Sequence, residues 1–120
     1  MAILNAVKKL KIPHFRGVFV RDTLPVEPER MECEILNLDD TLGNGTHWVA
    51  WYRDNGKNYY FDSYGIQPPN ELKRYVRSPI YYNTKQIQPK QEVFCDHLCL
   101  YVLKRLSLGK HLQEIVNNLY

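Results

Sequence analysis

The dipeptide Asn55-Gly56 most constrains the fold of this chain, because it separates two runs rich in aromatic and β-branched residues. Asn-Gly is the strongest short-range signal for a two-residue β-hairpin, since a type I′ turn requires two residues that tolerate positive φ. The flanking runs, residues 47–53 and 58–62, are therefore predicted to form paired antiparallel strands.

The position of this turn also predicts the register of the two strands. With residues 55 and 56 at its centre, paired residues have numbers that sum to 111, so Arg53 faces Asn58. The same arithmetic places His47 opposite Tyr64 and diagonal to Asp62, on one face of the sheet. Diagonal neighbours lie roughly 7–8 Å apart, which is within side-chain reach. A bulge or an odd-length loop would separate the pair.

Residues 94–103 form a second informative stretch, since their apolar side chains recur at helical spacing and predict a buried helix. A polar run with Pro89 precedes them, so the helix is expected to begin near Cys95. Backbone N–H groups and the helix dipole at such a terminus lower the pKa of a thiol. The side chains expected on the inner face are Leu98, Tyr101 and Val102, with Cys99 and Leu103 beside them. The plainer interpretation is that Cys95 and Cys99 are small hydrophobic core residues.

The remaining elements follow from periodicity and from the positions of proline and glycine. Helices are predicted at residues 2–10, after Pro68-Pro69, and at residues 112–119 beyond a helix C-cap at Gly109. Strands are predicted at residues 15–20, with a bulge at Gly17, and at residues 33–38, 79–82 and 85–88. Residues 39–45 are predicted to form a turn-rich loop. This mixture predicts an α+β fold with a mixed β-sheet.

Length and composition limit the class of protein. With 120 residues and 44% hydrophobic content, residues 1–120 are predicted to form a single domain with one modest core. No apolar run reaches the ~18–20 residues of a membrane helix, and residues 1–10 are too polar for a secretory signal, so an intracellular protein without membrane contact is expected. Three cysteines without a Cys-x-x-Cys pair indicate reduced thiols. The net charge of +3 is mild and typical of solvated basic surfaces.

The chemistry of a cysteine nucleophile requires a base, a group that orients the base, and donors for an oxyanion. Cys95, His47 and Asp62 are the candidates for nucleophile, base and orienting acid. Gln88, seven residues before Cys95, is the candidate oxyanion donor together with the backbone N–H of Cys95.

Each of these residues also has a plainer interpretation. A lone histidine at a strand start, such as His47, is more often a satisfied surface or core residue. Asp62 precedes Ser63 and is equally typical of a turn or cap. Gln86 and Gln91 compete with Gln88 for the role of donor, and spacing alone does not choose among them.

A metal or cofactor site is not indicated by the sequence. The residues that a zinc site would use are Cys95, His97, Cys99 and His111. His97 points away from the helical face that Cys95 and Cys99 share, and no structural-zinc spacing is complete. Since no Gly-rich phosphate loop is present either, no metal and no cofactor are predicted.

The order of these motifs resembles a known family. The motifs are Gly45-Thr46-His47-Trp48-Val49-Ala50, Tyr60-Phe61-Asp62-Ser63-Tyr64-Gly65, Gln88 with Cys95 seven residues later, and Cys99-Leu100. Together they resemble the adenovirus-type (adenain-like) cysteine proteases, in particular those carried by Polinton/Maverick-type DNA transposons and related viruses. The resemblance covers residues 12–106 and implies papain-like geometry, with a mixed sheet packed against a central helix that carries the nucleophile. It implies His47 as base, Asp62 as orienting residue, Gln88 as oxyanion donor and Cys95 as nucleophile.

The resemblance also implies a function. The expected reaction is peptide-bond hydrolysis through a thioester acyl-enzyme, in capsid precursors at glycine-containing sites during viral maturation. By the same analogy the partners are a protein substrate, an activating peptide and DNA, and the location is the nucleus or the virion. The oligomeric state is not indicated.

Asp96 departs from the family pattern, which has glycine directly after the nucleophile. A carboxylate roughly 6 Å from the thiolate opposes its formation by about 0.7–1.5 kcal/mol, or roughly half to one pKa unit. An acidic residue in the first helical turn nevertheless suits the helix dipole. Reduced activity is therefore expected, with added crowding of the substrate or the oxyanion loop.

Two alternatives stay open from the sequence. A SUMO- or ubiquitin-like-specific protease of the same clan also uses His-Trp and Asp-Ser, but its glutamine usually stands six residues before an Asp-Cys-Gly. The other alternative is a catalytically decayed binding module that keeps the fold.

Overall fold

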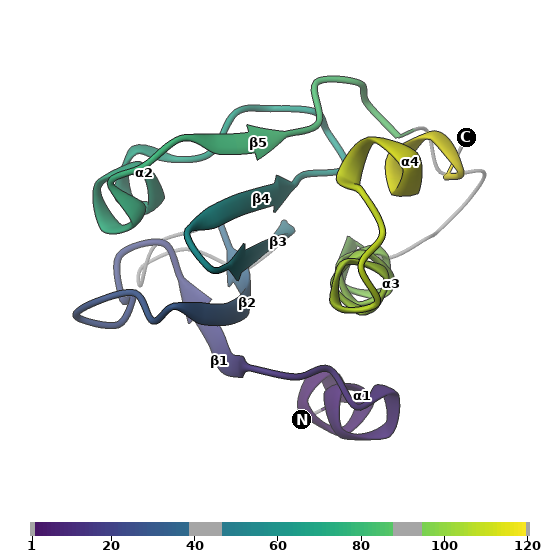
Figure 1. The fold of residues 1–120 in the computed structure, drawn as a ribbon, viewed down its shortest axis with the longest axis horizontal. Helices are drawn as coiled ribbons and strands as arrows, with labels where there is room; N and C mark the ends of the chain where they lie inside the picture. The colour runs from purple at the N-terminus through teal and green to yellow at the C-terminus, as the bar shows by residue number, and fades with distance from the viewer. Residues whose placement is uncertain (1, 39–46, 88–94, 120) are drawn as a thin grey trace.

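Residues 2–38, 47–87 and 95–119 are described by a computed structural model of the chain. Within them, five strands form one sheet in the order β1-β2-β3-β4-β5 (Figure 1). The strands are β1 (Phe15–Val20), β2 (Met31–Asn37), β3 (Trp48–Asp54), β4 (Lys57–Phe61) and β5 (Ile80–Tyr82). The two outer pairs are parallel and the two inner pairs antiparallel. The predicted α+β class with a mixed sheet is confirmed.

The hairpin between β3 and β4 has the predicted turn and register. Asn55 and Gly56 have φ values of 50° and 92°, as a type I′ turn requires. Arg53 pairs with Asn58, and the other pairs of the ladder follow the same register. The strand ends differ by one residue from the prediction: the ladder includes the pair next to the turn, while β3 begins at Trp48 and β4 ends at Phe61. Asp62 therefore comes directly after β4 and does not belong to it.

Four helices cover the sheet in the described part of the chain. They are α1 (Ala2–Leu10), α2 (Asn70–Val76), α3 (Cys95–Ser107) and α4 (Leu112–Asn117). The core that α1, α3 and α4 share lies on one face, and α2 covers the other (Figure 1). The predicted helices are confirmed, including the start of α3 at Cys95. None of them is long and apolar enough to cross a bilayer, as far as the described residues extend.

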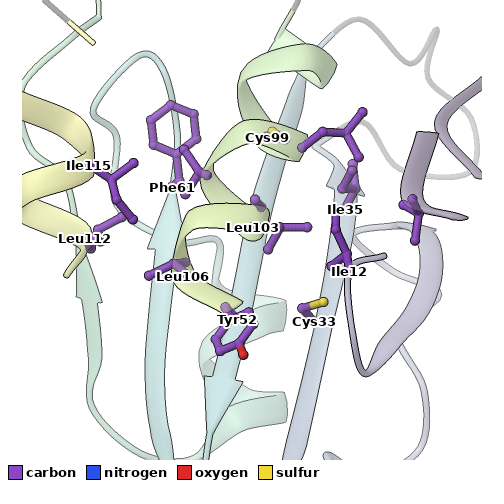
Figure 2. Close-up of a cluster of buried hydrophobic side chains, with 14 of the residues drawn as sticks. Ile12, Cys33, Ile35, Tyr52, Phe61, Cys99, Leu103, Leu106, Leu112 and Ile115 are labelled. Carbon is purple, nitrogen blue, oxygen red and sulfur yellow. The ribbon is translucent and has the colours of Figure 1, made fainter. Parts of the chain in front are cut away.

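The larger core lies between α3 and the middle strands (Figure 2). From α3 it contains Cys99, Leu100, Val102, Leu103 and Leu106, and from the sheet Cys33, Ile35, Ala50, Tyr52 and Phe61. The prediction that Tyr101 faces inward was wrong, since its side chain is 38% exposed. The residues on either side of Tyr101, Leu100 and Val102, are buried instead. The Arg105 guanidinium lies over the Tyr101 ring, with Cζ 5.1 Å from the ring centroid.

Two sequence predictions outside the hairpin have clear outcomes. The register between β1 and β2 shifts between Phe15 and Gly17, which confirms the bulge. The strand predicted at residues 85–88 was wrong over its described residues, because residues 85–87 form no ladder. Ile87 is buried and donates a single backbone hydrogen bond to Ser63, so its apolar character reflects core packing. The loop predicted at residues 39–45 lies outside the described residues.

The sheet face under α2 contains two fully buried acids, Glu32 and Glu34. Arg16 lies 3.3 Å from the Glu32 carboxylate, and the Tyr75 hydroxyl donates to it at 2.8 Å. Because Tyr75 belongs to α2, these contacts join α2 to the first two strands. Burial, followed by a hydrogen bond and the charge of Glu32, raises the pKa of Glu34 to about 9. Glu34 is therefore protonated at neutral pH.

Candidate active site

His47 is held at the entrance to β3 by the sheet itself. Its carbonyl oxygen accepts a hydrogen bond from the Leu38 N–H at 3.0 Å, which extends the β2–β3 ladder by one step. The His47 side chain is 13% exposed. The ring is therefore anchored by its backbone and still reaches solvent, as a general base must.

Asp62 contacts His47 directly from the end of β4. His47 Nε2 and Asp62 Oδ1 are 2.7 Å apart, and the Asp62 side chain is fully buried. The same oxygen accepts the Tyr64 N–H at 2.8 Å. Since an ionised carboxylate only accepts hydrogen bonds, Nε2 carries the ring proton and the neutral imidazole holds its lone pair on Nδ1. This pair can orient a base whose acceptor atom is Nδ1.

Tyr64 covers one side of the His47 ring from the turn that follows β4, beyond the last pair of the β3–β4 ladder, Ala50 and Phe61. The two ring centroids are 4.1 Å apart and the planes are parallel to within 1°. Tyr64 is 52% exposed. The stack therefore limits rotation of the imidazole at the edge of the protein without closing the site.

Cys95 is the first residue of α3, as predicted. The side chains of Cys95 and Asp96 lie outside the part of the chain that the structure describes. The direction of α3 is visible in Figure 2, where Cys99 lies at the level of Phe61 and Leu106 lies nearer the level of Tyr52. Phe61 is the last residue of β4, and Asp62 follows it. The N-terminus of α3 is therefore directed toward the end of the sheet that carries His47 and Asp62.

Tyr60 is a buried phenol near both Asp62 and Cys99. Burial raises the pKa of Tyr60 well above its ordinary value, and the nearby Asp62 and Cys99 raise it further. Asp62 follows β4 and Cys99 lies in the second turn of α3. Both are thus within electrostatic reach of one buried phenol, which stays neutral.

Gln88, the candidate oxyanion donor, lies outside the described residues, and so does its competitor Gln91. Gln86 is exposed. The residue before Gln88 is placed, because the Ile87 N–H donates to the Ser63 carbonyl at 2.8 Å. The chain leading to Gln88 therefore runs beside the turn that follows Asp62.

Sequence reasoning missed one residue at this site, Asn83. It follows β5 and is 4% exposed, and its side chain hydrogen-bonds to both backbone polar groups of Asp62. An asparagine after a strand normally indicates a turn, so the local sequence carries no signal for this contact. Among the described residues no group of three or more histidine, cysteine or acidic side chains is assembled as a metal site.

Comparison with known proteins supports the fold. No family model matches the chain, and no curated protein matches it either. Solved structures do match, among them a crystal structure of the selenomethionine form of the ASFV pS273R protease, with a TM-score of 0.58 and 20% sequence identity. The match covers 75% of this chain and 39% of that one, so this chain spans well under half of the matched protein. The α+β fold with a mixed sheet packed against the helix that begins at Cys95 is therefore similar to the fold of a viral protease.

Proposed function

We propose that this chain is a cysteine endopeptidase with Cys95 as nucleophile, His47 as general base, Asp62 as orienting acid and Gln88 as oxyanion donor. The observation that carries the proposal is the 2.7 Å contact between His47 Nε2 and Asp62 Oδ1. It lies at the end of the sheet toward which α3 directs its N-terminus, where Cys95 stands. The likeness of the fold to that of the ASFV pS273R protease supports a protease.

The mechanism follows from the proton on Nε2. In the first step His47 Nδ1 takes the Cys95 thiol proton, and the thiolate attacks the carbonyl carbon of the scissile peptide. The resulting oxyanion is stabilised by the Cys95 backbone N–H and the Gln88 amide. As the C–N bond breaks, His47 returns the proton to the leaving amine and a thioester remains. Asp62 holds the ring in position and stabilises the imidazolium at each stage.

The second half of the reaction uses the same groups with water. His47 Nδ1 removes a proton from water, which attacks the thioester carbonyl, and a second tetrahedral oxyanion forms. When this intermediate collapses, the C–S bond breaks, the carboxylic acid product leaves and the thiol regains its proton from His47. No metal and no cofactor takes part in these steps.

The substrate belongs to the same proposal. The ordered His, Asp, Gln and Cys motifs resemble adenovirus-type proteases of the Polinton/Maverick kind, which suggests capsid precursors cleaved at glycine-containing sites. By that resemblance an activating peptide and DNA are the proposed partners, and the nucleus or virion the proposed location.

Alkylation of Cys95 by iodoacetamide tests the mechanism directly. Cys33 and Cys99 are fully buried and should react slowly, so peptide mass spectrometry can compare the labelling of Cys95 with theirs in the same sample. We expect rapid labelling and cleavage of a Gly-Gly peptide by the wild type. His47→Ala should slow both by at least 10²-fold, and Cys95→Ala should abolish them. His111→Ala, an exposed histidine at α4, is the matched control and should react like the wild type. Equal labelling in the wild type and His47→Ala would disprove the mechanism.

Two further results separate the alternatives. Preferential labelling by a SUMO aldehyde, with no cleavage of the Gly-Gly peptide, would identify a SUMO-like-specific protease. A folded protein whose Cys95 reacts with no electrophile would indicate a binding module. For an active enzyme, Asp96→Gly should raise the labelling rate about 2- to 10-fold, because it removes the negative charge next to the thiolate.

A further inference from the structure

The backbone of Asp62 is held by one side chain from the neighbouring strand. Asn83 Oδ1 accepts the Asp62 N–H at 3.0 Å, and Asn83 Nδ2 donates to the Asp62 carbonyl at 2.7 Å. Nδ2 also donates to the Lys85 carbonyl at 3.2 Å. A single buried amide therefore satisfies both polar groups of the residue that contacts His47.

The position of Asn83 in the sheet explains this contact. The parallel ladder between β4 and β5 ends with Tyr60 paired with Tyr82, one residue before Asn83. Beyond this point the side-chain amide of Asn83 takes the place that the next peptide group of a strand would occupy. The ladder is thus extended to Asp62. Without Asn83 the buried Asp62 N–H would lose its partner, and the Asp62 carbonyl would lose one of its two donors.

The turn after Asp62 is fixed against the same segment. The Gly65 N–H donates to the Asp62 carbonyl at 2.8 Å, and Gly65 has a φ of 70°. A Cβ at this position would lie 2.6 Å from the Thr84 carbonyl oxygen, so the turn and residues 83–85 are in direct backbone contact. Any shift of this segment is therefore passed to Asp62.

We propose that Asn83 is a positioning residue for the His47–Asp62 pair, an inference that rests on the proposed function for its catalytic consequence. Asn83 keeps Asp62 Oδ1 at the distance and angle that hold the ring proton on His47 Nε2. Because a displacement of about 1 Å in a catalytic group lowers rates by roughly 10²-fold, loss of this clamp should reduce the reactivity of Cys95.

Asn58 provides a matched control at the other end of β4. It is fully buried, and its Nδ2 lies within hydrogen-bond distance of Ser78, Gly56 and Pro79, at 2.7, 3.3 and 3.2 Å. Both asparagines thus hold β4 to the segment around β5, but only Asn83 contacts Asp62. A purely structural role would give the same result at both positions.

The experiment compares Asn83→Ala and the isosteric Asn83→Asp with Asn58→Ala and Asn58→Asp, at a temperature where circular dichroism shows each variant folded. One readout is the downfield proton resonance of His47 Nε2, which reports the hydrogen bond to Asp62 without any need for turnover. The other is the rate of iodoacetamide labelling of Cys95. For the Asn83 variants we expect the resonance to move or broaden and the rate to fall roughly 10- to 100-fold. The Asn58 variants should keep the resonance and stay within about 2-fold in rate.

The outcomes distinguish this inference from the proposed function. Unchanged resonance and rate in a folded Asn83 variant, or equal changes in the Asn58 variants, would overturn the positioning role. If wild-type labelling does not depend on His47, the proposed function fails, whereas the resonance still tests the clamp. Hydrogen exchange of the wild type gives a test without substitution, because the Asp62 amide should be strongly protected and rapid exchange there would overturn the proposal.

Discussion

Two fully buried acidic sites in this protein have different surroundings. Asp62, at the end of β4, accepts hydrogen bonds from His47 Nε2 and the Tyr64 N–H. Glu32, in β2, pairs with Arg16 and accepts a hydrogen bond from the Tyr75 hydroxyl, and its neighbour Glu34 is protonated. Burial alone therefore does not identify a functional carboxylate. The difference is that Asp62 accepts a hydrogen bond from a partly exposed base, whereas Glu32 joins α2 to the sheet through Arg16 and Tyr75.

Removal of the Asp62 carboxylate should have the largest effect on reactivity. Asp62→Ala deprives His47 Nε2 of its acceptor, so we expect Cys95 labelling and peptide cleavage to fall by about 10²–10⁴-fold. Asp62→Asn keeps an oxygen for the same hydrogen bonds without the charge, and should fall between the alanine variant and the wild type. Stopped labelling assays on folded protein provide the measurement. If Asp62→Ala labels Cys95 and cleaves the peptide at wild-type rates, Asp62 has no more part in reactivity than Glu32 does.

Glu32 should show the opposite behaviour, with a large effect on stability and little on reactivity. Glu32→Gln leaves Arg16 without its buried counter-charge, and we expect the free energy of unfolding to fall by about 2–4 kcal/mol in urea titrations. The Cys95 labelling rate of the folded variant should stay within about 2-fold of the wild type. Glu29 also lies near Arg16, at 3.6 Å, but is 62% exposed, so Glu29→Gln is the control and should cost below about 1 kcal/mol. A Glu32→Gln protein with wild-type stability but slow Cys95 labelling would contradict the structural role of Glu32.

Glu34 should make stability depend on pH. Its pKa is raised from 4.5 to about 9 in the folded protein, so between these values the folded state binds more protons than the unfolded state. The stabilisation is fully present below about pH 4.5 and is lost as the pH rises through 9. The free energy of unfolding should therefore decrease with pH by at most about 1.4 kcal/mol per unit.

Urea titrations between pH 5 and 8.5 measure this slope, and Glu34→Gln should flatten it because the amide does not titrate. Glu114→Gln, at an exposed position of α4, is the control and should keep the wild-type slope. The same slope in Glu34→Gln and the wild type would show that Glu34 is not the titrating group.

The parts of the molecule that the sequence predicted are those encoded locally. Asn55-Gly56 determines turn type and register within four residues, and so brings His47 near Asp62. The start of α3 at Cys95 was also predicted, because a polar loop precedes a helical repeat. The catalytic roles of Cys95 and Gln88 stay predictions.

The parts that could not be predicted depend on contacts between distant segments. Glu32 and Glu34 are buried only because α2 packs over them, and the partner that makes this tolerable, Tyr75, is 43 residues beyond Glu32. Asn83 contacts Asp62 across 21 residues. In both cases a polar side chain in a strand or turn would ordinarily be expected to face solvent. Tertiary packing reverses that expectation.

Tyr64 should give the smallest effect and shows how much of the orientation of His47 comes from Asp62. Stacked rings contribute about 0.5–1.5 kcal/mol, and this one is 52% exposed, so Tyr64→Ala should slow Cys95 labelling by only about 2- to 10-fold. Tyr64→Phe keeps the ring and should react like the wild type, which separates the stack from the hydroxyl. The backbone N–H that Tyr64 donates to Asp62 is retained in both variants. If Tyr64→Ala were as slow as Asp62→Ala, the stack and not the carboxylate would be the main support of the base, and Asp62 would resemble the structural glutamates.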